Sequence, residues 1–263
     1  MKIGLVQMDI IWEDKEANKQ KCLQFIKEAK EKNVDMLIFP EMTLTGFSMK
    51  VNKIMDKNHQ DRNWFAKAAE EYSLFIGFGY VQGGGAKGKN NISLFSKDGV
   101  EILNYTKIHP FSHGEENKHY EGGGEIKIAK VKEFNISTFI CYDLRFPEIF
   151  QAASVCAEAI FIIANWPESR REHWITLLKA RAIENQCYII GVNRTGKGDG
   201  VDYCGDSLVV DPSGEIIVHN RGEEKLITAD IDLQEVKKVR NSFNIKQDRK
   251  NALYSQLLNN PLV

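Results

Sequence analysis

The apolar positions along the chain follow two spacings, one helical and one typical of strands. Within residues 15–32 the apolar side chains recur at i, i+3, i+4 and i+7, which predicts an amphipathic helix. These side chains are Cys22, Phe25, Ile26 and Ala29. Other apolar runs, such as residues 159–164, are too short for helices and indicate buried strands.

The same criteria assign elements to the rest of the chain. Strands are expected at residues 2–9, 35–40, 74–82, 91–96, 101–106, 136–140, 159–164, 186–193, 203–211, 215–219 and 225–232. Helices are expected at residues 15–32, 61–72, 146–156 and 171–185, followed at the end of the chain by a short helix and a polar tail. The glycines at 83–85 lie between strands and precede no Lys-Ser or Lys-Thr helix start, so they indicate a hairpin turn, not a phosphate-binding loop.

This alternation of helices and strands predicts the α/β class, with sheets covered by helices. The frequent hairpins mean that the sheets are not purely parallel. Two packed sheets between outer helix layers suit the pattern, and so does a single doubly wound sheet; periodicity alone does not choose between them. No linker or low-complexity segment interrupts residues 1–263, so one domain is expected.

Composition narrows the classes of function. Among 263 residues, 35 Lys and Arg balance 36 Asp and Glu, for a formal net charge of −1. Nucleic acids and anionic membranes attract clustered positive charge, so neither is expected as a partner. No apolar run approaches the roughly 20 residues that span a bilayer. The first residues indicate a strand without the apolar stretch of a secretory signal, so a cytoplasmic location is expected.

The cysteines indicate neither a disulfide framework nor a metal site. The chain has five, an odd number, with no CxxC pair, and its histidines show no HxH or HExxH spacing. A structural metal site is therefore not expected. Most of the cysteines should be buried apolar residues, and one is a candidate nucleophile.

Three reactive side chains follow the ends of predicted strands, where active sites of helix-covered sheets form. They are Glu41, Lys107 and Cys141. An ordinary thiol has a pKa near 8.5 and is mostly protonated at neutral pH, so Cys141 needs a base such as Glu41 to attack an electrophilic carbon. Lys107 would stabilise the negative charge of a tetrahedral intermediate, and the backbone N–H of Tyr142 is a second candidate donor.

Each of these residues also has a structural interpretation. A strand-end Cys is usually a packing residue, a Glu after Pro a solvated charge, and a lone Lys a surface residue. A Cys–His dyad would need one of the histidines at 109, 113, 119 and 173, and the sequence around Cys141 lacks the glycine-rich surroundings expected of such enzymes. Composition and spacing leave catalytic and structural interpretations open.

Three blocks that contain these residues resemble, in order, the motifs of the nitrilase, or carbon–nitrogen hydrolase, superfamily. The blocks are Phe39-Pro-Glu-Met-Thr-Leu-Thr-Gly-Phe, Lys107-Ile-His-Pro-Phe and Ile140-Cys-Tyr-Asp-Leu-Arg-Phe-Pro-Glu. The resemblance implies a four-layer αββα sandwich, no metal or organic cofactor, and dimers or larger assemblies. It further implies that Glu41 is the general base, Lys107 stabilises the intermediate and Cys141 is the acylated nucleophile.

The family often has a second glutamate shortly after the lysine, which orients the substrate amide. Glu115 and Glu116 are both candidates for this accessory catalytic role. The sequence does not choose between them, and at least one of the two must be a solvated loop carboxylate.

Further blocks are similar to the omega-amidase group, which hydrolyses the side-chain amides of 2-oxoglutaramate and 2-oxosuccinamate. These blocks are Ala164-Asn-Trp-Pro and Ala180-Arg-Ala-Ile-Glu-Asn-Gln. A carboxylate substrate would suit Arg170 or Arg171, because arginine binds carboxylates through two parallel hydrogen bonds. Arg145 is expected instead in a structural ion pair, while Phe111 and Trp166 are candidate pocket walls.

Two alternative functions also fit these residues. The same catalytic residues with a different pocket would hydrolyse N-carbamoyl amides or other aliphatic amides. A non-catalytic binding module would use Cys141 as a redox sensor. The segment from about residue 237 resembles the family's C-terminal arm, which can cover a neighbouring subunit, so a homodimer is expected.

Overall fold

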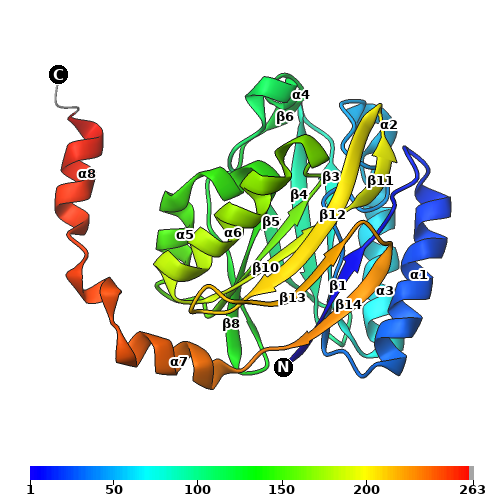
Figure 1. Cartoon of the computed structure of the whole chain (residues 1–263). Helices are drawn as coiled ribbons and strands as arrows, with labels where there is room; N and C mark the ends of the chain where they lie inside the picture. Colours follow the sequence, from blue (N-terminus) through cyan, green and yellow to red (C-terminus); the bar gives the residue numbers. More distant parts are fainter. Residues whose placement is uncertain (261–263) are drawn as a thin grey trace.

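The computed structural model describes residues 1–260 and contains two seven-stranded sheets packed face to face (Figure 1). The first sheet has the order β14 (Lys225–Asp230), β1 (Lys2–Gln7), β2 (Met36–Ile38), β3 (Phe75–Gln82), β4 (Gly88–Phe95) and β5 (Glu101–Thr106), with β6 (Tyr120–Glu121) paired to β4. The second has the order β11 (Thr195–Gly198), β12 (Val201–Val210), β10 (Tyr188–Asn193), β9 (Ala159–Ala164), β8 (Phe134–Ile140) and β7 (Ile128–Val131), with β13 (Ile216–Arg221) paired to β12.

Both sheets are mixed, as the hairpins in the sequence require. In each sheet three central strands run parallel, β1–β2–β3 in one and β8–β9–β10 in the other. Antiparallel partners flank them on both sides, including β4 and β14 in the first sheet and β7 and β12 in the second.

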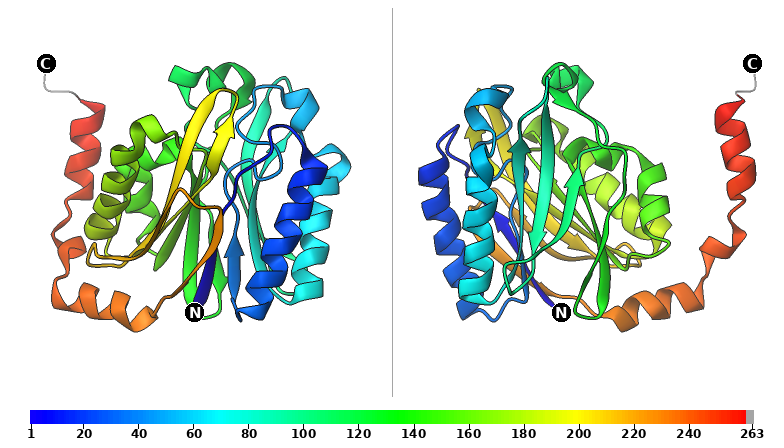
Figure 2. Two further views of the ribbon diagram at one scale, coloured as in Figure 1. Left: turned by 45° about the vertical axis from the view of Figure 1, so that its right-hand side comes forward. Right: turned by 180° about the vertical axis from the view of Figure 1, so that it is seen from behind.

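Helices cover the outer face of each sheet, which gives the four αββα layers implied by the resemblance (Figure 2). The first sheet is covered by α1 (Lys15–Glu31) and α3 (Gln60–Tyr72), and the second by α5 (Pro147–Ala153) and α6 (Arg171–Asn185). The side chain of Asp14 caps α1 by accepting from Ala17 N–H at 3.1 Å. The expected apolar stripe of α1 buries Cys22, Ile26 and Ala29 against the sheet.

The inner faces of the two sheets contribute to one continuous apolar core. Leu5 and Ile38 of the first sheet pack in the same cluster as Phe139 and Ile162 of the second. This arrangement selects the packed-sheet architecture over the single doubly wound sheet, and the fold prediction is confirmed. No helix within residues 1–260 is long and apolar enough to span a bilayer.

Shorter helical segments connect the main elements. They are α2 (Val51–Ile54), α4 (Glu116–His119), α7 (Leu233–Ser242), α8 (Asn251–Asn259) and the 3₁₀ segments η1 (Lys57–His59), η2 (Ser112–Gly114), η3 (Cys141–Arg145), η4 (Glu168–Arg170) and η5 (Ile245–Asp248).

The C-terminal arm, residues 237–260, leaves the sandwich at α7, and α8 stands apart from the sandwich in Figure 1 and in the right view of Figure 2. The prediction of a polar tail is wrong for residues 251–259, which form α8. Leu253, Tyr254, Leu257 and Leu258 place an exposed apolar stripe on this helix. Their i, i+1, i+4, i+5 spacing is helical. Residues 261–263, included in the expected single domain, lie outside the described residues.

Candidate active site

Cys141 lies immediately after β8, where the strand turns into η3. Its φ of +47° is in the left-handed region, which is uncommon for a residue other than glycine. Asp143 holds this turn, because its Oδ2 accepts a hydrogen bond from Ile140 N–H at 3.1 Å. The turn leaves Cys141 half-buried, facing a pocket at the carboxyl ends of the parallel strands.

Glu41 follows β2 on a segment that packs directly on β3. Thr43 N–H donates to Gly79 O at 2.9 Å, and Gly79 N–H donates to Thr43 Oγ1 at 3.0 Å. A Cβ on Gly79 would lie 2.8 Å from the Glu41 Cα, so the close approach of the two backbones requires glycine there. The Glu41 side chain is completely buried.

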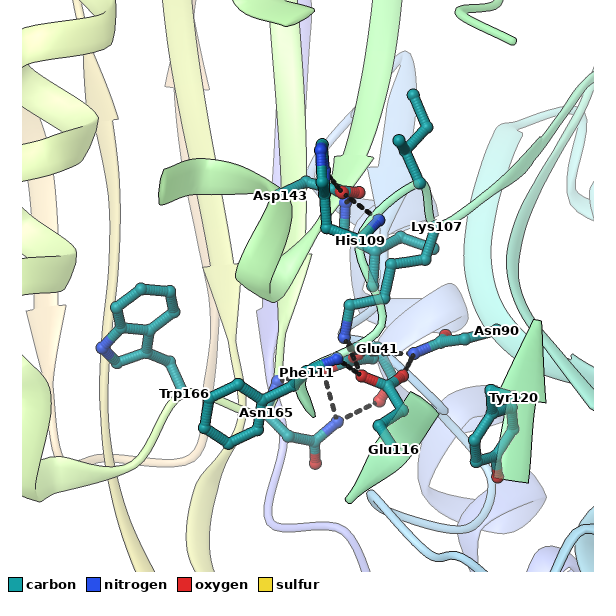
Figure 3. Close-up of polar contacts among 12 residues, drawn as sticks. Glu41, Asn90, Lys107, His109, Phe111, Glu116, Tyr120, Asp143, Asn165 and Trp166 are labelled. Carbon is teal, nitrogen blue, oxygen red and sulfur yellow. Dashed lines mark hydrogen bonds and ion pairs between the residues drawn. The ribbon is translucent and has the colours of Figure 1, made fainter. Parts of the chain in front are cut away.

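Lys107 follows β5 and reaches between two buried carboxylates (Figure 3). Its Nζ lies 3.1 Å from Glu41 Oε1 and 2.8 Å from Glu116 Oε2. All three side chains are at most 1% exposed. The structure therefore places Lys107 in contact with Glu41, and the interpretation of Lys107 as a surface residue is wrong.

The two carboxylates are fixed by further donors. Asn90 Nδ2 donates to Glu41 Oε1 at 2.7 Å and to Glu116 Oε1 at 2.9 Å. Asn165 N–H donates to Glu41 Oε2 at 2.8 Å, and Phe111 N–H donates to Glu116 Oε2 at 2.6 Å. These contacts keep both carboxylates in one geometry, as preorganised catalysis requires.

The electrostatics of this cluster favour a charged lysine and a neutral thiol. Burial disfavours the ammonium form of Lys107, but Glu116 and Glu41 outweigh burial and raise its pKa. Burial, reinforced by Glu41, raises the pKa of the Cys141 thiol well above its usual range, with Lys107 opposing. A nucleophilic role for this thiol would therefore require that its proton be lost during attack, not before it.

The structure separates the two adjacent glutamates that the sequence left open. Glu116 points into the cluster, whereas Glu115 lies on the surface with its side chain 63% exposed and paired with Lys118. Glu115 has a φ of +59°, which reverses the chain between the two side chains. The candidate catalytic role of Glu115 is therefore withdrawn.

The pocket above the cluster has a volume of about 300 Å³ and contains Cys141 and Lys107 in its wall. All four residues predicted to bind substrate also contribute to this wall. They are Phe111, Tyr142, Trp166 and Arg170. Phe47, Asn165 and Tyr203 line it as well and were not predicted.

The arginines differ from expectation in two respects. Arg145 was expected in a structural ion pair, yet within residues 1–260 it makes none, and it lines the pocket with its guanidinium 4.7 Å from the centre of the Trp166 ring. Arg171, the alternative to Arg170, turns away from the pocket and pairs with Asp206 at 2.7 Å. The side that each arginine faces depends on the turns of η3 and η4, which the sequence pattern did not specify.

The histidines do not support a Cys–His dyad. Within residues 1–260 no histidine lines the pocket. His109 instead binds Asp143, with its Nδ1 2.8 Å and its backbone N 3.0 Å from Asp143 Oδ1. His109 therefore connects the lysine loop to the turn that contains Cys141. No cluster of three or more His, Cys, Asp or Glu in the described part of the chain could hold a metal ion.

Asn90 and Asn165 are the important polar residues that sequence reasoning missed. Asn165 directly follows β9, as Cys141 follows β8, so the strand-end criterion could have found it. Asn90 lies inside β4 and is 1% exposed. The strand predicted at residues 91–96 begins one residue after Asn90, so the sequence pattern gave no signal for it.

Comparisons with known proteins agree with this fold. Residues 2–241 match the carbon-nitrogen hydrolase family model. The chain is 34% identical to a 2-oxoglutaramate amidase of Bacillus subtilis, over 96% of this chain and 98% of that protein. It is 33% identical to an omega-amidase of Escherichia coli, over 94% and 96%. The solved structure of a CN-hydrolase superfamily protein from Xanthomonas campestris superposes with a TM-score of 0.89 at 28% identity, covering 95% and 97%.

The fold and the comparisons together define the class as a hydrolase that acts on carbon–nitrogen bonds, with amidohydrolase activity. The chain belongs to the carbon-nitrogen hydrolase family, and the resemblance found in its sequence is confirmed.

Proposed function

We propose that the protein is an omega-amidase, which hydrolyses the side-chain amide of a small carboxylate substrate such as 2-oxoglutaramate and releases ammonia. We assign the catalytic roles to Glu41, Lys107 and Cys141, with Glu116 as the accessory carboxylate. The observation that carries this proposal is the buried ammonium of Lys107, held by Glu41 and Glu116 in the wall of the pocket that contains Cys141. The names of the B. subtilis and E. coli relatives support the choice of substrate class.

The first half of the reaction forms a thioester. Glu41 accepts the Cys141 proton as sulfur attacks the amide carbon, which couples deprotonation to attack and suits a thiol of raised pKa. The carbonyl oxygen gains negative charge, which the Lys107 ammonium and the Tyr142 N–H stabilise. Glu41 then returns the proton to the amide nitrogen, the C–N bond breaks, and ammonia leaves.

The second half regenerates the enzyme. Water attacks the thioester carbon and gives its proton to Glu41. The C–S bond breaks, the product leaves as a carboxylic acid, and the proton returns to Cys141. Glu116 keeps Lys107 in place during both halves of the reaction. Phe111 N–H donates to the same Oε2 that accepts from Lys107, and this contact fixes the Glu116 carboxylate.

A substrate panel with two variants tests the proposal. The wild-type protein should release ammonia from 2-oxoglutaramate faster than from carbamoyl-β-alanine, and the opposite order would favour the N-carbamoyl alternative. Cys141→Ala should abolish turnover with the fold intact, and Lys107→Ala should lower the rate by roughly 10²–10³, the usual effect of one oxyanion donor. Turnover by Cys141→Ala would refute the mechanism.

Two further features of the protein stay predictions. We expect a homodimer in which the arm contacts the partner, and a cytoplasmic location where 2-oxo acid amides would be available as substrates. The exposed apolar stripe of α8 supports the first expectation.

A further inference from the structure

We propose that Asn90 is a positioning residue for proton transfer, whose side-chain amide confines the proton lost by Cys141 to a single oxygen of Glu41, Oε2. This inference rests on the proposed function and deepens it. It names the residue that sets the path of the proton between the nucleophile and its base.

Asn90 contacts both buried carboxylates of the site through one group, its side-chain amide nitrogen (Figure 3). Nδ2 donates to Glu41 Oε1 at 2.7 Å and to Glu116 Oε1 at 2.9 Å. The backbone of the same residue also holds the lysine, because Lys107 N–H donates to Asn90 O at 2.9 Å. Asn90 lies within β4 and is 1% exposed, so these contacts are shielded from solvent.

The two carboxylates also fix the direction in which the Asn90 amide faces. The nitrogen of a side-chain amide carries two hydrogens, whereas its oxygen only accepts. The reverse orientation would place Oδ1 against two carboxylate oxygens. In the orientation found, both hydrogens of Nδ2 are used, and Oδ1 has no hydrogen-bond partner within residues 1–260. Asn90 therefore requires that Oε1 of each glutamate stays unprotonated.

The two oxygens of Glu41 differ in the donors that they meet. Oε1 accepts from Asn90 at 2.7 Å and from Lys107 at 3.1 Å, so both of its lone pairs are used. Oε2 accepts from Asn165 N–H at 2.8 Å. Its contact with Asn165 Nδ2 is long, at 3.4 Å, because that nitrogen donates to Glu41 O at 2.7 Å. Oε2 is therefore the oxygen of Glu41 that can take up a proton.

The same oxygen shares a neighbour with the nucleophile. Burial, reinforced by Glu41, raises the pKa of the Cys141 thiol, and Lys107 and the N–H group of Asn165 oppose this rise. Asn165 N–H thus acts on both the Cys141 sulfur and Glu41 Oε2. During attack the S–H bond breaks, its electron pair stays on sulfur and forms the bond to the amide carbon, and the proton binds Oε2. The same proton then moves to the leaving nitrogen.

Loss of the Asn90 amide would open other places for this proton. Within residues 1–260, Glu116 Oε1 accepts only from Asn90, so it would lose its single donor. Glu41 Oε1 would keep only the donor from Lys107. A proton held on either oxygen would be withdrawn from the transfer between Cys141 and Oε2.

Two tyrosines also face the carboxylates. Tyr120 lies near both glutamates, and Tyr203 lines the pocket near Cys141. Burial raises the pKa of Tyr120, and it raises the pKa of Tyr203 to about 12. Both hydroxyls therefore stay protonated at neutral pH, and a change in the low-pH part of the activity profile reports on the carboxylates.

Asn90→Asp tests the inference, because it replaces the donating nitrogen with an oxygen of similar size and position. A third carboxyl group then competes with the two glutamates for a proton. The low-pH limb of kcat/KM for 2-oxoglutaramate should move to higher pH by about one unit or more. We expect kcat to fall about 10- to 100-fold, with KM within about threefold of the wild type. Asn90→Ala, which removes the donors without adding an acid, should move the limb in the same direction by less.

Asn91→Asp is the matched control. Asn91 is the next residue of β4 and is also 1% exposed. Its side chain lies on the other face of the strand, where it donates to the Tyr80 hydroxyl at 3.2 Å and to Gln82 Oε1 at 3.0 Å. The pH of half-maximal kcat/KM does not depend on the fraction of folded protein, so a loss of stability in a variant does not move it. In the control this pH should equal that of the wild type.

An unshifted limb in Asn90→Asp would overturn the inference, and so would an equal shift in Asn91→Asp. If Asn90→Asp does not fold, an unshifted limb in Asn90→Ala decides the matter in the same way.

Alkylation of Cys141 by iodoacetamide separates this inference from the proposed function, because it needs no substrate. Mass spectrometry gives the rate constant of this cysteine alone as a function of pH. A profile displaced to higher pH in Asn90→Asp, but not in Asn91→Asp, supports the role of Asn90 even if the wild-type protein hydrolyses no amide. That result would refute the proposed function alone. Amide hydrolysis by the wild type, with one alkylation profile common to all three proteins, would refute the role of Asn90 alone.

Discussion

Glu116 Oε2 lies 2.8 Å from Lys107 Nζ, closer than Glu41 Oε1 at 3.1 Å. The residue that holds the lysine most closely is thus Glu116, which we propose as the accessory carboxylate, and not Glu41, which we propose as the general base. Glu41 is left with one oxygen, Oε2, that does not contact the lysine and, within residues 1–260, accepts only from Asn165. This division of contacts suits one acid that positions Lys107 and another that transfers a proton.

The adjacent glutamates provide a matched pair of variants. Glu116→Gln should lower kcat/KM for 2-oxoglutaramate by about 10- to 100-fold, because a neutral amide holds the Lys107 ammonium less strongly. Glu115→Gln removes the same charge one residue away on the surface and should leave the rate within about twofold. Ammonia release measures both. Equal losses in the two variants would contradict the assignment of Glu116.

Alkylation by iodoacetamide tests the coupling between Cys141 and Glu41. Cys141 should react faster than the buried Cys22 and Cys187, and a substrate amide should protect it. Because the pKa of its thiol is raised, this reactivity at neutral pH depends on proton transfer to Glu41. Glu41→Gln should therefore slow alkylation of Cys141 below that of the exposed Cys156, which serves as the internal reference.

Mass spectrometry of the alkylated peptides follows each cysteine separately. In Glu41→Gln the Cys141 rate should rise about tenfold per pH unit, as for an unassisted thiol below its pKa. Rapid, pH-independent alkylation of Cys141 in this variant would show that Glu41 is not its base.

The strands and the long helices could be predicted because their apolar patterns are strong. β5, β9 and α6 have the predicted bounds, and α1 differs by one residue. Elements with weak apolar patterns were not predicted. β11 (Thr195–Gly198) contains two glycines and was missed, although it pairs with β12 through four residues. Its conformation depends on a partner strand and not on its own propensity.

The candidate site could be predicted as far as strand ends determine it. Glu41, Lys107 and Cys141 meet because β2, β5 and β8 end at the same edge of the packed sheets. Side-chain direction in the connecting loops was not predictable. The left-handed turn at residue 115 selects Glu116, and η3 directs Arg145 into the pocket, and both depend on tertiary contacts with no local signal.

Asp143 should be the main stabilising residue of the nucleophile turn. It is completely buried and accepts from the Tyr105 hydroxyl at 2.7 Å as well as from Ile140 and His109. Burial and Asp143 raise the pKa of Tyr105, so its hydroxyl stays a donor. Asp143→Asn should lower the free energy of unfolding by about 3 kcal/mol, and Tyr105→Phe by about 1 kcal/mol. Urea unfolding measures both, and equal effects would contradict this hierarchy.

The arm should show a pH dependence through Lys246. Its ammonium donates to Ser154 O at 2.5 Å, and burial, reinforced by Arg240 and Arg249, lowers its pKa to about 8 from 10.5; Glu158 opposes. Between these values the unfolded chain binds more protons than the folded chain, so the free energy of unfolding rises with pH. Lys246→Met should reduce this rise relative to the wild type in urea unfolding across that range. An identical pH profile for the two proteins would contradict the lowered pKa.

We expect the exposed helix α8 to be covered by a second copy of the chain. This helix has nine residues, all exposed, and helices shorter than about 12–15 residues are marginal in water without packing. Its apolar stripe therefore needs a partner surface, and a second copy of the chain provides one at equal concentration. Leu257→Ser with Leu258→Ser should convert a dimer to a monomer in sedimentation velocity, whereas Val100→Ser, which removes an exposed apolar side chain from the β4–β5 turn, should not. A monomeric wild-type protein would exclude this role for the arm, and a dimer that survives the double substitution would place the interface elsewhere.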